Sequence, residues 1–188
     1  VKTVPGRGYV LASPVARSAT SLPKENGAPP RVPTDRPSIA VLPFADLSGG
    51  GADHDFFADG ITEEITTALC RLDGFLVIAR NTMSTYRGQA VDITRLGREL
   101  GVRYVLEGSV RRAGDSIRVT AQLLEADGGR HIWAERYDRR VEHVFAIQDE
   151  ITASIVGRLG TELLAAEYSR VSRKPTHDLD AWACVVRA

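Results

Sequence analysis

The chain has 188 residues, and its 24 Lys and Arg residues balance its 24 Asp and Glu residues. This length suits one domain with attached segments. The zero net charge gives no global reason to expect nucleic acid or an acidic membrane surface as a partner, so any basic surface must be local. No run approaches the roughly 20 consecutive apolar residues of a membrane span, and the first residues do not read as a leader segment. We therefore expect a cytoplasmic protein with no membrane partner.

The two cysteines and the chain ends add little chemistry. Cys70 and Cys184 lie far apart, each in an apolar helical pattern, so they indicate neither a disulfide framework nor a metal knuckle. We expect both to be small core residues. Because the chain begins with Val1 and ends on Ala188 inside a helical pattern, we also expect it to be cut from a longer protein.

The first 37 residues divide into a hairpin signal and a linker. Residues 1–4 and 9–11 are β-prone and flank Pro5-Gly6-Arg7-Gly8, where proline fixes one turn dihedral and glycine accepts positive φ. This predicts a hairpin within residues 1–17. Residues 18–37 hold five prolines among Ser, Gly and charged residues. So little apolar surface cannot offset the entropy of ordering, and we expect a linker there.

A strand, a helix and a second strand follow the linker. The apolar run from Ile39 to Leu42, ahead of Pro43, is typical of a strand buried on both faces. Apolar residues then recur at helical spacing, namely Ile61, Ile65, Ala68, Leu69 and Leu72. We expect Glu63 and Glu64 in an early turn of this helix and Gly74 at its end. Residues 75–79, Phe-Leu-Val-Ile-Ala, predict a second buried strand and so a βαβ unit.

The second half predicts a helix, a three-stranded meander and a long helix. Asp92 is a good N-cap for a helix that Gly101 ends. Tyr104, Leu106, Gly108 and Val110 would share one face of a strand, and apolar residues alternate with polar ones from Ile117 to Leu123. Turn residues stand at 114–115 and 127–129. Residues 144–163 carry apolar residues at helical spacing.

These elements predict an α/β domain over residues 38–166. We expect a mixed sheet of about five strands, in the order β-α-β-α-β-β-β-α, with helices packed on it. Residues 167–174 run polar, and an apolar pattern restarts at Leu179. We therefore expect residues 167–188 to be a linker and the first helix of a further, truncated domain.

No pattern in the domain predicts catalysis or a resident cofactor. Adjacent glutamates such as Glu63 and Glu64 point in different directions on a helix and cannot form a facing carboxylate pair. The histidines are scattered without metal-ligand spacing. Asp46, Asp53, Asp55 and Asp59 surround three glycines after the first strand, where α/β sheets often bind ligands. The segment lacks the nucleotide-binding glycine patterns, and its charge would repel phosphate, so we favour a solvated loop over a cation site.

Two groups of basic residues could bind an anion. Arg111, Arg112 and Arg118 converge across one hairpin, which fits nucleic acid or an anionic ligand, although charged outer sheet faces are common. At the start of the chain, Lys2 and Arg7 beside Gly8 fit a contact to a phosphate or a groove. On chemistry alone, an ordinary terminal hairpin is the more economical interpretation of residues 1–17.

Several segments carry a resemblance to a known family. They read SIAVLPF from Ser38, FADGITEEI from Phe57, VIARN from Val77, ELGVRYVLEGSVR from Glu99 and IWAERYD from Ile132. Together they resemble the TolB amino-terminal-like domain of bacterial signalling proteins. Residues 1–11, VKTVPGRGYVL, resemble the closing wing hairpin of OmpR/PhoB-type winged helices, as in CadC-like regulators. Residues 179–188 resemble the first helix of tetratricopeptide repeats.

The resemblance implies a different role for each segment of the chain. Residues 1–17 would end a winged-helix DNA-binding domain, with Lys2, Arg7 and Gly8 at or near the DNA. The α/β domain would be a non-catalytic sensor or coupling segment of a cytoplasmic transcriptional regulator, able to form homo-oligomers. The repeats would bind protein partners. The alternative is an accessory segment of a class III adenylate or guanylate cyclase, and a small-ligand receptor using the acidic loop is a third interpretation.

Overall fold

The computed structural model describes residues 2–4, 8–10, 36–49, 55–141, 143–173 and 181–187. Its strands are β1 Lys2–Val4, β2 Gly8–Val10, β3 Ser38–Val41, β4 Ala45–Asp46, β5 Leu76–Val77, β6 Tyr104–Ala113, β7 Ser116–Glu125 and β8 Arg130–Arg140. Its helices are α1 Asp55–Leu69, α2 Arg80–Ser84, α3 Ile93–Leu100, α4 Val144–Ser172 and α5 Ala181–Arg187. In the described part of the chain, no helix is long and apolar enough to cross a membrane.

The main sheet has six strands and is mixed, as an α/β domain with antiparallel additions should be. Its order is β5-β3-β6-β7-β8, with β4 also paired to β6. β3 is parallel to β5 and to β6, whereas β6, β7 and β8 form the predicted antiparallel meander. The α/β class is confirmed. The sixth strand is β4, which pairs with β6 after the irregular residues 42–44 and was not predicted.

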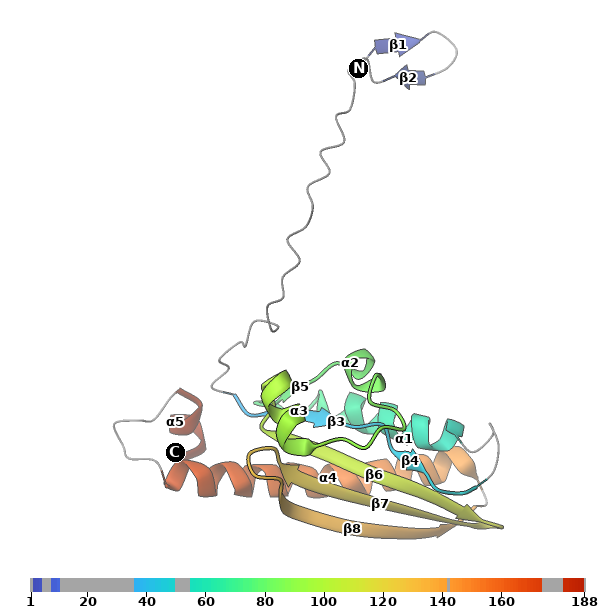
Figure 1. The fold of residues 1–188 in the computed structure, drawn as a ribbon, viewed down its shortest axis with the longest axis vertical. Helices are drawn as coiled ribbons and strands as arrows, with labels where there is room; N and C mark the ends of the chain where they lie inside the picture. Colours follow the sequence, from blue (N-terminus) through green and yellow to red (C-terminus); the bar gives the residue numbers. More distant parts are fainter. Residues whose placement is uncertain are drawn as a thin grey trace.

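The inner face of the sheet carries the larger core. Helices α1 and α4 pack side by side on this face, behind the sheet in Figure 1. The predicted alternation is confirmed, because Tyr104 and Leu106 of β6 and Val119 and Leu123 of β7 are all buried in this core. Along α4, residues spaced by three or four are buried against the same face, namely Ile147, Ile151, Ile155, Leu159 and Leu163.

The outer face is covered over only part of its width. A smaller core lies there, formed by residues in β3, β6, α2 and α3 or next to the ends of these elements and of β7: Ala40, Leu42, Met83, Leu96, Val102, Val105 and Ala126. Beyond it, the outer-face residues at the end of β6 and along β8 are exposed. This side of the meander therefore faces solvent at the end of β6 and along β8.

Helix caps and tight turns follow the sequence closely. The Asp92 side chain accepts a 3.0 Å hydrogen bond from the backbone N–H of Arg95, and Gly101 ends α3 with φ of 67°. Gly114 and Gly128 also have positive φ, at the two turns of the meander. These predictions are confirmed because they depend on local backbone chemistry alone.

Other local expectations were wrong. The strand expected over residues 75–79 is only Leu76–Val77, because α2, which was not predicted, begins at Arg80. Helix α1 begins at Asp55, so Glu63 and Glu64 lie in its middle and not in an early turn. Cys70 and Cys184 are exposed rather than buried.

Helix α4 continues through the boundary predicted at residue 166. It runs to Ser172, and Glu167 is fully buried within it. The carboxylate of Glu167 accepts hydrogen bonds from Tyr104 Oη at 2.6 Å, from Arg103 at 2.8 Å and from Arg170 at 2.8 Å. These residues tie the end of α4 to the start of β6, so the last turns of the helix belong to the α/β domain. We name Arg103, Tyr104, Glu167 and Arg170 the Glu167 cluster.

Candidate functional site

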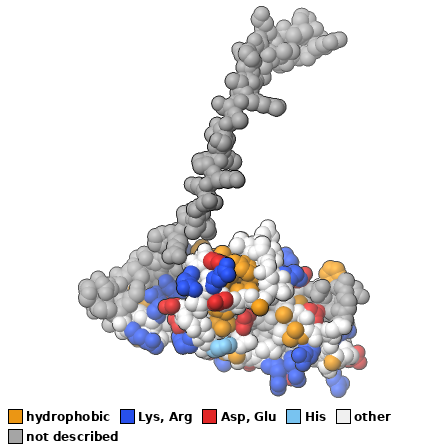
Figure 2. All heavy atoms as spheres, in the orientation of Figure 1, with side chains coloured by type: hydrophobic (Ala, Val, Ile, Leu, Met, Phe, Trp, Pro, Cys, Tyr) orange, Lys and Arg blue, Asp and Glu red, His pale blue; other side chains and the backbone are white. Residues whose placement is uncertain are grey.

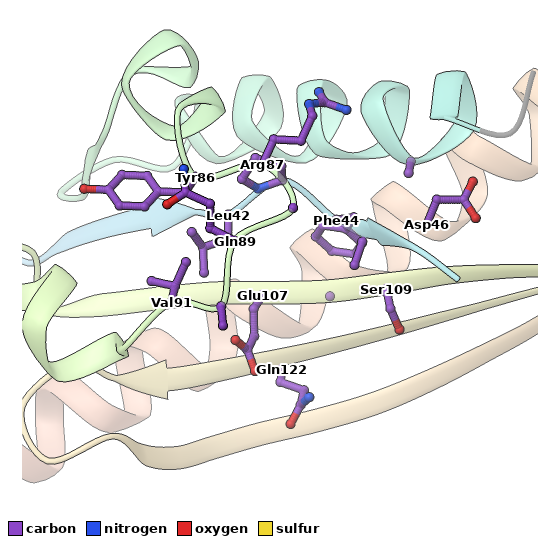
Figure 3. Close-up of a pocket in the computed structure, with 16 residues that line it drawn as sticks. Leu42, Phe44, Asp46, Tyr86, Arg87, Gln89, Val91, Glu107, Ser109 and Gln122 are labelled. Atoms are coloured by element: carbon purple, nitrogen blue, oxygen red, sulfur yellow. The ribbon is translucent and has the colours of Figure 1, made fainter. Parts of the chain in front are cut away.

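A cavity of about 690 Å³ lies at the carboxyl end of β3. Its volume falls within the range of small-molecule sites, and ligands of α/β sheets commonly bind at this end of the parallel strands. Leu42 and Phe44 follow β3 on one side, and the segment from Tyr86 to Val91, which joins α2 to α3, forms the other wall. Figure 3 shows this segment passing over the sheet with the cavity beneath it.

The floor of the cavity is the outer face of the sheet. Glu107 and Ser109 of β6 and Gln122 of β7 supply polar side chains there, and Glu107 and Gln122 are opposite each other in the strand register. Figure 3 shows these two side chains close together below the joining segment. Gly108 lies between the two β6 residues, and the ring of Phe44 packs where its side chain would be. A glycine is therefore required at this point for Phe44 to pack against β6 as it does.

The charges around the cavity favour a neutral or cationic ligand over phosphate. Arg87 is the one basic residue among the described lining residues, and its guanidinium pairs with Asp59 of α1 at 2.5 Å. Asp46 and Glu107 are the acidic lining residues. One oxygen of Asp46 accepts a 2.6 Å hydrogen bond from the backbone N–H of Ser48. The other oxygen is buried and has no partner among the described residues.

The acidic segment predicted after the first strand does not form one cluster. Asp46 lines the cavity, and Asp59 is neutralised by Arg87. Asp55 begins α1, and Asp53 lies outside the described residues. Within the described ranges, no group of three or more His, Cys, Asp or Glu residues could hold a metal ion.

The adjacent glutamates of α1 point apart, as predicted. Glu63 pairs with Arg80 at 2.8 Å, whereas Glu64 accepts a 3.3 Å hydrogen bond from Thr152 of α4. Burial against α4 raises the pKa of Glu64 despite that hydrogen bond. The two carboxylates therefore make separate contacts, although both line a further cavity of about 620 Å³ between α1 and α4.

The residues predicted to contact DNA lie at the start of the chain. Lys2 is in β1 and Gly8 is in β2, and these strands pair antiparallel with Val4 opposite Gly8. Arg7 lies outside the described residues. The predicted hairpin is present, while the roles of Lys2, Arg7 and Gly8 at DNA stay predictions.

The three arginines of the β6–β7 hairpin are only partly brought together. Arg111 and Arg118 stand directly opposite each other, and both are exposed on the outer face. Arg112 points to the other face, where it lines a pocket with Val110 and Ile117. Sequence reasoning missed Arg136 and Arg140 of β8. These residues share the outer face with Arg118, because Asp138, which lies between them, is opposite Arg118.

The structure thus defines a mixed α/β domain with a ligand-sized cavity at the end of its first buried strand and a basic stretch on its outer sheet face. Residues 34–154 match the model of the HilA/YgeH-like transcriptional regulator, second domain. The chain belongs to this family, whose model covers the whole cavity and all three strands of the meander.

One curated protein is similar over most of the chain. It is 50% identical over 160 residues, comes from Rhizobium meliloti (strain 1021) and bears the name "Putative adenylate cyclase 3". The match takes in 85% of this chain but only 27% of that protein. The chain therefore spans about a quarter of the length of this relative.

Several solved structures are similar at low identity. Lipoprotein GNA1162 from Neisseria meningitidis has a TM-score of 0.49 and 18% identity, over 65% of this chain and 95% of that one. The LpoB C-terminal domain from Escherichia coli has a TM-score of 0.46 and 17% identity, over 55% and 82%. TolB from Acinetobacter baumannii has a TM-score of 0.44 and 16% identity, over 67% and 28%.

Proposed function

We propose that residues 38–166 are the sensor and coupling domain of a cytoplasmic transcriptional regulator that binds DNA through a winged helix upstream. The observation that carries the proposal is the family match over residues 34–154, which covers the main sheet, helices α1 to α3 and the first turns of α4. The β1–β2 pairing supports a wing hairpin ahead of it. In this proposal the domain is non-catalytic, and Lys2, Arg7 and Gly8 contact the DNA backbone or minor groove.

The cavity suggests how such a domain would sense a signal. A small neutral or cationic molecule bound there would contact Phe44 and the joining segment above Glu107. Phe44 follows β3, a fully buried strand that begins at Ser38, directly after the linker from the hairpin. Binding would therefore act on the strand that is continuous with the DNA-binding side of the chain.

The far end of the domain offers a second route of coupling. Helix α5 packs against α4, and Ala183 is fully buried there. The proposal takes α5 as the first helix of tetratricopeptide repeats that bind protein partners and permit homo-oligomers. The Glu167 cluster would then hold the start of the repeats in a fixed position relative to the sheet.

Selection of genomic DNA fragments by the purified full-length protein tests the proposal. We expect a small set of fragments to be enriched in a sequence-dependent manner, because a winged helix reads bases in the major groove. The same preparation should make no cyclic nucleotide from ATP or GTP. Failure to enrich any fragment would contradict the regulator proposal.

The second candidate function is the corresponding segment of an adenylate or guanylate cyclase. It is favoured by the 50% identity to the Rhizobium meliloti protein of that name. In this case the catalytic aspartates would lie in an upstream domain, and the α/β domain would keep its accessory role. Cyclic nucleotide formation by the full-length protein, without fragment enrichment, would select this alternative.

A small-ligand receptor is a third interpretation and shares the cavity with the first. A thermal-shift screen of neutral and cationic metabolites tests it, because a ligand that binds only the folded state raises the melting temperature. If no compound stabilises the domain at high concentration, the sensing part of the proposal fails while the DNA-binding part stands.

A further inference from the structure

Four arginines form a basic surface on the solvent-facing side of the meander. They are Arg111 of β6, Arg118 of β7 and Arg136 and Arg140 of β8, and we call them the outer basic surface. All four are exposed. Figure 2 shows Lys and Arg side chains gathered at the lower right of the domain, where Figure 1 places the β6–β7 turn and the end of β8.

The strand register explains how these residues come together. Arg111, Arg118 and Asp138 form one row across three strands. Arg136 and Arg140 lie two residues to either side of that row on β8, about 14 Å apart at the usual rise of an antiparallel strand. The surface therefore spans three strands, about 10 Å across at the usual strand spacing.

Charge compensation within this surface is incomplete. Asp138 binds Arg118 through two hydrogen bonds of 2.6 and 3.2 Å and lies 3.4 Å from Arg136. No ion pair or side-chain hydrogen bond to another described residue is present for Arg111 or Arg140. Glu107 is on the outer face of β6 but lines the cavity floor, and Asp115 is in the β6–β7 turn.

This arrangement of arginines does not stabilise the folded sheet by itself. Arg111 and Arg118 are directly opposite each other on one face, and like charges in that position destabilise a sheet. The local excess is also unusual for a chain whose net charge is zero. A bound polyanion would relieve the repulsion between these two arginines and supply partners for Arg111 and Arg140.

We propose that the outer basic surface binds the phosphate backbone of double-stranded DNA. A duplex carries one negative charge per about 1.7 Å of its axis, so a 14 Å length holds about eight phosphates, enough to engage four guanidinium groups on one side. Such contacts position a protein on DNA without reading its sequence. The choice of DNA among polyanions rests on the proposed function, and the surface adds a contact separate from the winged helix.

The test measures binding of a short, labelled duplex of mixed sequence to the 188-residue chain by fluorescence anisotropy. Four phosphate contacts predict a log–log salt slope of about −3.6, so affinity falls about 150-fold between about 50 and 200 mM salt. For the Arg111→Gln/Arg140→Gln variant we expect a slope of about −1.8 and a fall of about 12-fold. This variant should melt no lower than the parent chain, because neither side chain loses a partner.

Matched controls separate this surface from other basic groups. Arg71→Gln/Arg95→Gln removes the same charge from exposed residues outside the surface and should keep the parent slope. Arg7→Ala in the same chain should keep most of the binding. A duplex that does not bind, or a slope that falls equally in the Arg71/Arg95 control, would overturn the proposal.

Binding through the hairpin and binding to other polyanions are the remaining outcomes of the test. Loss of binding only with Arg7→Ala would assign the contact to the hairpin and overturn the proposal. Tighter binding to phosphatidylserine vesicles or to single-stranded RNA than to the duplex would also overturn it. If this chain binds duplex DNA through the surface but the full-length protein makes cyclic nucleotide, the proposed function fails and this inference stands.

Discussion

Removal of the Glu167 carboxylate should strongly destabilise the α/β domain. The carboxylate is fully buried and accepts hydrogen bonds from Tyr104, Arg103 and Arg170. Breaking a buried ion pair by removing one partner usually costs about 3–5 kcal/mol. Because the arginine side chains are 25% and 23% exposed and can be rehydrated, we expect about 3 kcal/mol for Glu167→Ala, near the low end of that range.

A double-mutant cycle with Tyr104→Phe isolates one contact of the Glu167 cluster. Tyr104 is itself fully buried, and its hydroxyl donates to Glu167 at 2.6 Å. A hydrogen bond to a charged group contributes about 1.5–3 kcal/mol, so the two substitutions should couple by about 1.5 kcal/mol. Urea unfolding followed by circular dichroism measures each free energy. A loss below about 1 kcal/mol for Glu167→Ala, or additivity within error, would refute this account of the cluster.

The same cluster predicts a pH dependence. Burial raises the pKa of Glu167, but hydrogen bonds from Arg170, Tyr104 and Arg103 outweigh burial and leave the pKa below its ordinary value. A carboxyl group with a lowered folded-state pKa stabilises the protein above its unfolded-state pKa. This stabilisation should be lost as the pH falls below about 4.5 and through the lowered folded-state pKa. Glu167→Gln should flatten the decline in unfolding free energy over that window.

Four further substitutions test separate parts of the chain. Gly108→Ala should cost about 1–3 kcal/mol, because the new methyl group overlaps the Phe44 ring; Gly157→Ala, in an open part of α4, should instead stabilise by up to about 1 kcal/mol. Chemical denaturation compares the two, and equal effects would contradict the packing argument. Asp92→Ala should cost about 1 kcal/mol by removing the cap of α3, measured in the same way. Arg7→Ala in the full-length protein should weaken operator binding and make its salt slope shallower by about one, and an unchanged slope would count against the wing prediction.

Features that depend on local pattern could be predicted from the sequence. Alternation along residues 104–110 and 117–123 identified the buried face of the meander, because a strand presents successive side chains to opposite faces. Asp92 and Gly101 marked the ends of α3 through backbone chemistry that needs no tertiary contact. The same patterns could not reveal β4. Its two residues, Ala45 and Asp46, pair with Ser109 and Val110 in the second half of β6, which is a contact between distant parts of the chain.

Features that depend on distant residues were missed or misplaced. Glu167 looked like the start of a polar linker, because its partners Arg103 and Tyr104 lie more than 60 residues earlier. Arg136 and Arg140 joined the arginines of the hairpin only through the register of β8 on β7. Helical periodicity likewise predicted burial for Cys70, which lies just beyond the end of α1 and is exposed.

The candidate cavity was not predicted from the sequence. A solvated loop was favoured for the acidic segment after the first strand, whereas Asp46 of this segment lines the cavity. Its opposite wall comes from residues 86–91 and its floor from Glu107 and Gln122, which no local pattern connects with that segment. The order of strands in the sheet, and not any motif, brings these pieces together.

Transcription from a promoter that the full-length protein selects is the most direct measure of the central claim, that this domain couples a signal to DNA-bound regulation. The decisive comparison is between the full-length protein and a form that lacks residues 36–173, with a DNA footprint as the control for the winged helix. The account predicts that the shortened protein still protects its site but no longer changes transcription as the full-length protein does. A shortened protein that protects its site and regulates transcription normally would contradict it.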